Sequence, residues 1–359
     1  MSFFNSSVLL VFVMIFNSCT SHVGPETIKQ ERQDFNIALQ KTSDEQMLLN
    51  LVRMKYRDTG MFLEVSSIAS QYVLKNSLAA SGDFQDSFSR SIGVGAGISY
   101  EEKPTVSYTP LQGQKFITRM LTRVSPATLS LLHGSGWSIE RLFLVCVERV
   151  NSVKNAPSAS GPTPSYVPEY KEFQRFAKVL RRLQRADAIE GQLAHVGKYP
   201  GFIMKMNENA SAADKKEFLD ILGIKEQELY VFSGNRQAQT EGHIYFETRS
   251  LREVLFYLSQ GVTAPQEHID NGNVTLTKYN DGKVFDWREL TKDVLIVKSK
   301  DGLSPNDAYV RIHYRNHWYY IADNDLNTKS TFNLLMQLYN LQAGNTQTSA
   351  PVLTLPIGG

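Results

Sequence analysis

The chain has 359 residues, enough for two domains that each have a core of their own. Hydrophobic residues make up 42% and charged residues 21%, as in ordinary globular proteins. The net charge of +2 lacks the basic excess of a dedicated nucleic-acid binder, so we expect no nucleic-acid partner.

The first 18 residues carry no charge, and residues 8–16 form an unbroken apolar run. A transmembrane helix needs about 20 apolar residues, so this run is too short to span a bilayer. Its length suits the central region of a secretory signal. We therefore expect a signal peptide over residues 1–18.

The leader ends in Asn17-Ser18-Cys19, which resembles a bacterial lipobox, with Phe16 where leucine is usual. Such a sequence is cleaved before the cysteine, and Cys19 then carries fatty acids such as palmitate. Thr20 in place of aspartate resembles the signal for export to the outer membrane. Lipidation predicts an outer-membrane lipoprotein that faces the periplasm. The alternatives are a simple secretory signal and a buried apolar segment.

The second cysteine of the chain, Cys146, lies in an apolar helical stripe and is expected to be a small buried side chain. A disulfide between Cys19 and Cys146 is the alternative. No Cys-x-x-Cys pair is present, which excludes a zinc ribbon and a thioredoxin-like centre.

Residues 19–153 are expected to form a mainly helical domain with a glycine-rich hairpin. Helices are predicted over 26–56, with a new cap within 42–45, over 67–78, and in three pieces over 114–150. A short strand is predicted over 62–65. The hairpin is expected over 92–108, with its turn at 101–104.

The glycines at positions 93, 95 and 97 do not form a nucleotide-binding fingerprint, because no helix follows them. Small and apolar residues alternate around them, as in outer-membrane strands. The hairpin therefore either joins copies of the chain and reaches the membrane, or is an ordinary solvent-facing hairpin.

Residues 154–168 contain four prolines and no periodicity, which predicts a linker. An α+β domain with antiparallel strands is expected over 169–345, followed by a tail over 346–359. Its helices are predicted over 170–189, 212–222 and 251–260, the last opened by a capping box of Ser250 and Glu253. Its strands are predicted over 201–206, 228–232, 243–247, 274–278 and 294–298.

The helix over 170–189 has a basic outer face. The candidate interaction residues on it are Arg175, Arg181, Arg182 and Arg185. This face could meet anionic lipid headgroups or an acidic partner. The alternative is a solvated helix surface.

Residues 308–314 and 318–321 form the sharpest strand pair of the sequence, and a helix is predicted from Ser330 or Thr331 to Gly344. His313 and His317 could face each other across the turn, with Asp323 and Asp325 nearby. This candidate polar cluster is either a small-ligand or metal site or a polar rim. A calcium loop is excluded, because Thr328 stands where glycine is needed. We expect no bound metal and no cofactor.

No catalytic motif is present: there is no His-Glu-x-x-His, no Gly-x-Ser-x-Gly and no phosphate-binding loop. We therefore favour a binding or structural protein over an enzyme.

Several segments resemble an uncharacterised family of bacterial envelope lipoproteins. They are residues 45–50 (EQMLLN), 106–111 (VSYTPL), 255–262 (LFYLSQGV), 330–332 (STF) and 351–356 (PVLTLP). The resemblance implies a common fold and a location in the cell envelope, and it implies no activity.

The sequence thus predicts a lipid-anchored, non-catalytic scaffold or assembly component of an envelope complex, with an envelope protein or further copies of itself as partners. The alternative is an enzyme or a small-ligand or metal binder with a pocket in the C-terminal α+β domain.

Overall fold

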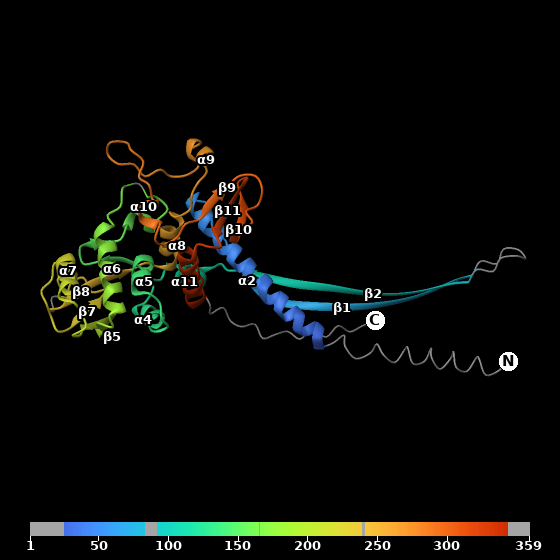
Figure 1. Ribbon diagram of the computed structural model, residues 1–359, viewed down its shortest axis with the longest axis horizontal. Coiled ribbons are helices and arrows are strands. Elements are labelled where there is room, and N and C mark those ends of the chain that lie inside the picture. Colours follow the sequence, from blue (N-terminus) through green and yellow to red (C-terminus); the bar gives the residue numbers. More distant parts are fainter. Residues whose placement is uncertain (1–24, 83–91, 165, 239–240, 344–359) are drawn as a thin grey trace, which may run out of the picture. The chain divides into compact units, whose positions relative to one another are not determined.

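The computed structural model describes residues 25–82, 92–164, 166–238 and 241–343, and they form the predicted α+β fold (Figure 1). The chain divides into two compact units. One comprises Met1–Gly60 with Leu121–Leu341, and the other comprises Met61–Met120 with Gln342–Gly359. The predicted signal peptide over 1–18, Cys19 and the tail over 346–359 lie outside the described residues.

The Met61–Met120 unit is dominated by one long antiparallel ribbon, made of β1 (Leu63–Gly82) and β2 (Ile92–Pro110). The register runs from Leu63 opposite Pro110 to Gly82 opposite Ile92, with one irregularity between Val65 and Ser67. The helix α3 (Gln114–Leu121) follows the ribbon. At the base, the Phe62 and Phe116 rings lie 6.0 Å apart.

Two local predictions in this region were wrong. Residues 67–78 were expected to be helical but belong to β1, and residues 101–104 were expected to turn but continue β2. Pro104 lies opposite Ser70 within the ladder. Proline has no backbone N–H, so a strand tolerates it where the backbone nitrogen faces an edge that is not hydrogen-bonded. Each strand of a two-stranded ribbon has such an edge. The conformation of residues 67–78 and 101–104 depends on their partners in the opposite strand, which a local sequence pattern does not indicate.

The larger unit contains a six-stranded sheet in the order β4-β3-β8-β7-β6-β5. The strands are β3 (Val147–Val150), β4 (Val153–Lys154), β5 (Ile189–Val196), β6 (Tyr199–Met206), β7 (Tyr230–Ser233) and β8 (His243–Thr248). All neighbours are antiparallel except β7 and β8. β5 was not predicted: the helix expected over 170–189 ends at its first residue, and no element was assigned to residues 190–196.

Four helices lie beside this sheet (Figure 1). They are α4 (Pro126–Gly134), α5 (Ile139–Cys146), α6 (Lys171–Arg185) and α7 (Ala212–Leu222). Phenylalanine rings from the helices and strands meet in the core, with neighbouring centroids 4.5 to 6.3 Å apart. The rings are Phe143, Phe176, Phe202, Phe218, Phe232 and Phe246. Cys146 is buried in the same region, as predicted.

The predicted linker over 154–168 packs inside the larger unit, so the chain does not divide there. Residues Pro157–Ser160 form a short 3₁₀ helix, and Asn155 is 1% exposed. The fully buried Arg249 guanidinium donates to the carbonyls of Leu144, Val147 and Asn155. A distant cation therefore fixes a segment whose composition indicates a flexible connection.

A second sheet has the order β10-β11-β9 and comprises β9 (Lys298–Lys300), β10 (Ala308–Tyr314) and β11 (His317–Ala322). The helices of this part are α8 (Leu251–Ser259), α9 (Gln266–Asp270), α10 (Arg288–Thr291) and α11 (Leu326–Ala343). The capping box of Ser250 and Glu253 is present, as predicted. Leu326 rather than Ser330 or Thr331 begins the last helix.

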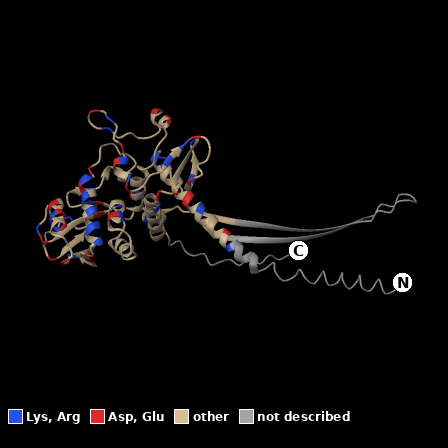
Figure 2. Cartoon of the chain, viewed as in Figure 1, with Lys and Arg blue, Asp and Glu red and all other residues tan. Residues whose placement is uncertain are grey.

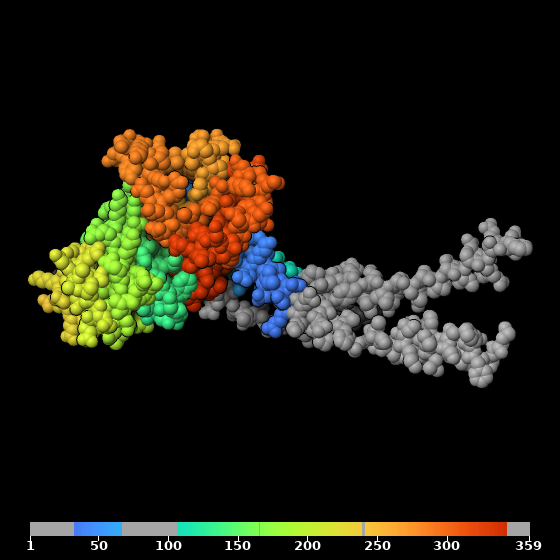
Figure 3. Space-filling view, viewed as in Figure 1, coloured from blue at the N-terminus to red at the C-terminus, as the bar shows by residue number. Residues whose placement is uncertain are grey.

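The first helix, α2 (Pro25–Lys55), is continuous over 31 residues, and the break expected within 42–45 does not occur. Asp44 instead lies in its middle and accepts a hydrogen bond from the Tyr309 hydroxyl at 2.9 Å. Leu48 and Leu51 are completely buried. The C-terminal half of α2, blue in Figure 3, thus packs against the orange and red C-terminal segments.

Candidate functional site

The predicted polar cluster depends on how β10 and β11 pair. Arg315 and Asn316 form a two-residue turn with φ of 47° and 69°, so that Tyr314 lies opposite His317 and His313 lies opposite Trp318. Successive residues of a strand point to opposite faces of the sheet. His313 and His317 therefore lie on opposite faces.

The four candidate residues make separate contacts. His313 is exposed, and its ring centroid lies 5.1 Å from that of Trp318. Asp323 pairs with Lys329 at 2.6 Å, and Asp325 accepts from the backbone N–H of Thr328 at 3.0 Å. His317 is buried. The structure does not bring these residues together, and over the described ranges no three His, Cys, Asp or Glu side chains could hold a metal ion.

The basic face of α6 is largely paired with α7. Arg182 contacts Asp214 at 2.6 Å and Glu217 at 2.5 Å, and Arg175 contacts Glu217 at 3.3 Å. The hydrogen bond to Arg182 holds the pKa of Asp214 below its usual range. Figure 2 shows the blue side of α6 next to the red positions of α7.

The other two predicted arginines differ from this pair. Arg181 donates to Gln184 Oε1 at 2.6 Å, and Arg185 is exposed at the end of α6. The face is thus partly a seam between two helices, which leaves fewer unpaired cations for an acidic partner.

The structure contains a buried hydrogen-bonded cluster that sequence reasoning missed. The Tyr56 hydroxyl lies 2.6 Å from His268 Nδ1 and 2.5 Å from the Tyr319 hydroxyl. The His268 and His317 rings are in edge contact, with centroids 4.7 Å apart. We call Tyr56, His268, His317 and Tyr319 the tyrosine–histidine cluster. It joins α9 and β11 to the residue that directly follows α2, and its two tyrosines, Tyr56 and Tyr319, are 263 residues apart in the chain.

Charged groups surround this cluster. His317 Nε2 lies 2.7 Å from Asp301, and its Nδ1 lies 2.9 Å from the carbonyl of Arg315. The Arg315 guanidinium lies 4.8 Å from the centre of the Tyr56 ring and pairs with Asp58 at 2.9 Å. Both ring nitrogens of His317 therefore have an oxygen partner.

Burial governs the protonation of the cluster. Desolvation raises the pKa of Tyr56 and of Tyr319, so both hydroxyls stay protonated. Desolvation, with His317 as the second cause, lowers the pKa of His268. The Tyr56 hydroxyl is thus hydrogen-bonded both to His268 Nδ1 and to the Tyr319 hydroxyl. All four side chains are at most 7% exposed, so the cluster fastens α2 to the C-terminal part and offers no surface to a substrate.

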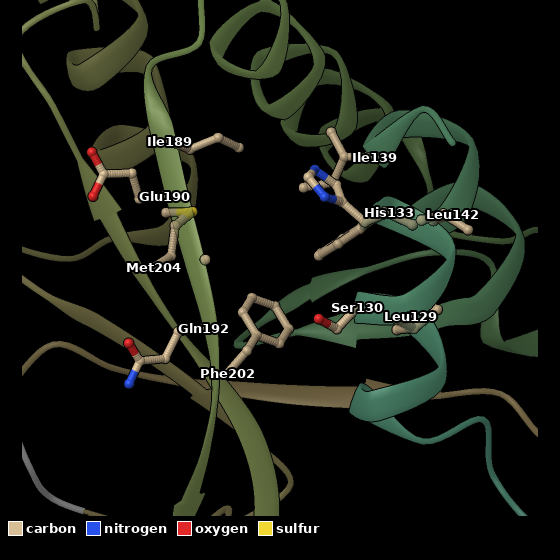
Figure 4. A pocket seen from close by; sticks show the side chains of 12 residues that line it. Leu129, Ser130, His133, Ile139, Leu142, Ile189, Glu190, Gln192, Phe202 and Met204 are labelled. Carbon is tan, nitrogen blue, oxygen red and sulfur yellow. The ribbon is translucent and has the colours of Figure 1, made fainter. Parts of the chain in front are cut away.

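The described residues also form an apolar pocket of about 110 Å³ between α4 and α5 on one side and β5 and β6 on the other (Figure 4). Phe202 and Met204 project into it from β6, facing Leu142 and the ring of His133. Sequence reasoning missed this pocket as well, because its β5 wall was not predicted.

No helix within the described parts of the chain has both the length and the apolar character needed to span a bilayer. Comparison with known proteins gives no further assignment: no family model, curated protein or solved structure matches this chain.

Proposed function

We propose that this protein is a lipoprotein anchored through Cys19 to the outer membrane, where it faces the periplasm as a non-catalytic assembly component of an envelope complex. In this proposal the β1–β2 ribbon joins copies of the chain to one another. The lipobox-like sequence supports the anchor, and the ribbon supports the assembly.

The observation that carries the proposal is the length of the ribbon. Its strands have 20 and 19 residues, and at about 3.3 Å per residue the longer one spans about 65 Å. Strands of globular proteins usually have 3–10 residues, and an isolated two-stranded hairpin is at best marginally stable in water. Such a ribbon therefore needs neighbouring strands.

A second copy of the ribbon is the partner that fits best. Over the described residues, the sheet of β1 and β2 has two strands, so each strand has one edge without a ladder. Unpaired edges are templates for further strands. A copy of the same chain brings strands of matching length, and in a closed ring of identical subunits each edge of a ribbon meets the edge of a neighbour, with Pro104 as the one position of β2 before its last residue that donates no N–H.

The anchor strengthens this assembly. Lipidation confines the copies to one surface and so raises their effective concentration. The first half of α2, which leads from the anchor, is also open to contacts: Ile37 is 55% exposed, and residues 32–43 are exposed or half-buried.

The test is the oligomeric state of the full chain in mild detergent, measured by size exclusion with light scattering. We expect a defined oligomer from the wild type. The double substitution Val73→Pro with Leu74→Pro removes two consecutive N–H groups, one from each side of β1, and should give monomers. The control, Val73→Ile with Leu74→Ile, keeps the donors and should assemble. A monomeric wild type, or an oligomeric proline variant, would overturn the proposal.

The anchor is tested separately. Cys19→Ser should abolish palmitate labelling and release the chain from the membrane fraction. A wild-type chain that takes up no palmitate would remove the anchor from the proposal without affecting the ribbon test.

A further inference from the structure

We propose that the pocket between α4–α5 and β5–β6 binds a small uncharged molecule with an apolar body, such as a six-membered ring or short alkyl chain, and one hydrogen-bond acceptor. This inference is independent of the anchor and of the ribbon.

The floor of the pocket is apolar and rigid. Leu129, Leu142, Phe143 and Met204 line it, and each is at most 4% exposed. A cavity of about 150 Å³ with similar walls accommodates benzene in another protein. The 110 Å³ of this pocket, which opens to solvent, therefore suits one ring or a chain of similar size.

The mouth of the pocket is polar, unlike that of a packing defect. Ser130 and His133 line it from α4, and both are exposed. Figure 4 shows Ser130 and His133 on α4 facing β5 and β6 across the opening. An apolar interior with a few polar groups at its edge is the usual form of a small-molecule site.

The hydrogen bonds of Gln184 determine which His133 nitrogen donates. Gln184 Oε1 accepts from the backbone N–H of Ile139 at 3.0 Å and from Arg181 at 2.6 Å, so the oxygen position is fixed. Gln184 Nε2 then donates to the Trp137 carbonyl at 3.1 Å and to His133 Nε2 at 3.3 Å. His133 Nε2 is thus an acceptor, and the proton of the neutral ring lies on Nδ1. That N–H is a donor for a ligand.

The electrostatics of the mouth favour an uncharged ligand. Desolvation lowers the pKa of His133, so the ring is neutral at pH 7. Glu190 lies on the other face of β5 from Met204 and Phe202, and its carboxylate points away from the opening (Figure 4), so no charged side chain of the lining faces the ligand. The guanidinium of Arg181 is already engaged by Gln184. A charged group of either sign would meet an apolar floor without partners, which makes its desolvation costly.

Three probes of one shape test these features: cyclohexanone, cyclohexane and cyclohexanecarboxylate. Binding is followed by amide chemical shifts of the full chain carrying Cys19→Ser, so that no acyl group competes. We expect saturable shifts at Ile139 and Gly191 with cyclohexanone. Cyclohexane should bind about fivefold more weakly, since one hydrogen bond is lost. The carboxylate should bind at least tenfold more weakly.

Substitutions on α4 locate the site. Ser130→Phe fills the mouth and should weaken cyclohexanone binding at least tenfold. Leu131→Phe adds a ring at the next position, which is 62% exposed and does not line this pocket, and should leave binding unchanged. His133→Phe should reduce cyclohexanone to the affinity of cyclohexane. Absence of saturable binding, equal effects of Ser130→Phe and Leu131→Phe, or a preference for the carboxylate would overturn the inference.

Discussion

The β1–β2 ribbon and the six-stranded sheet use the same ladder but differ in what covers it. The sheet has strands of at most eight residues, flanked by helices and filled by a cluster of phenylalanines. The ribbon has strands more than twice as long and no third strand over the described residues. The sheet is thus covered within its own unit, whereas the two-stranded ribbon lacks such cover over the described residues, and in our proposal other copies of the chain supply it. Four predictions test how far the larger unit is self-sufficient.

The largest effect is expected in the aromatic core. Phe176 is fully buried on α6 and packs against Phe143 and Phe218. Phe176→Ala should lower the free energy of unfolding by about 3–5 kcal/mol, since it leaves a cavity. Denaturant titration measures the loss, with the exposed Lys178→Ala on the same helix as the control. A loss below 1 kcal/mol would mean that the sheet is not held by this core.

The tyrosine–histidine cluster should give the next largest effect. Tyr56→Phe leaves His268 Nδ1 and the Tyr319 hydroxyl without their shared partner in a buried setting, which costs about 1–3 kcal/mol. Hydrogen exchange should increase first in α2. Tyr309→Phe, which removes one bond at the half-buried Asp44 contact, is the milder control. Equal exchange in both variants would show that the cluster does not fasten α2.

Acid should weaken the same contact. The pKa of His268 is lowered in the folded state, so the unfolded chain binds more protons below its ordinary value of about 6.5. The contribution of His268 to stability should therefore be complete near pH 7.5, well above that value, and be lost as the pH drops through it to 5.5. His317, Arg315, Asp301, Glu267 and the Tyr56 hydroxyl face this ring.

The slope of this pH dependence identifies the group. His268→Asn keeps an acceptor for Tyr56 without a titrating proton and should reduce the slope. Burial also lowers the pKa values of His133 and His243. The substitutions His133→Phe and His243→Gln should each reduce the slope of stability against pH independently of His268. An unchanged slope in His268→Asn would exclude His268 as the source.

The smallest effect is expected on the surface of α6. Arg182→Ala breaks exposed pairs to Asp214 and Glu217 and should cost about 0.2–1 kcal/mol, less at high salt. Arg185→Ala, at an exposed position of the same helix, should stay within about 0.5 kcal/mol. A similar loss of unfolding free energy in both variants would mean that the ion pairs of Arg182 with α7 do not contribute to stability.

Much of the fold was predicted from sequence patterns that are complete within a few neighbouring residues. α7 has the predicted bounds of 212–222, the capping box of Ser250 and Glu253 is formed, and β10 and β11 pair as expected. Each depends on a cap, a turn or a period that is complete within a short stretch.

Signals that depend on distant partners were not predicted. Pro104 in β2 indicates a turn until Ser70 is known to lie opposite it, and residues 154–168 resemble a linker until Arg249 is seen to bind them. The same holds for the site. His313 and His317 lie on opposite faces because the register pairs His317 with Tyr314 and not with His313. The contact between Tyr56 and Tyr319 has no local pattern in the sequence that would indicate it.

The ribbon is encoded inside the larger unit, between Gly60 and Leu121, and this order has a consequence for biogenesis. The hydrogen bond between Tyr56 and Tyr319 joins residues 263 positions apart. The larger unit therefore cannot complete its core until nearly the whole chain has been synthesised. During that interval the long strands are already synthesised, with their edges open to any other nascent chain. Unpaired strand edges make incompletely folded chains prone to aggregation, and in this chain β1 and β2 carry that risk for the longest time.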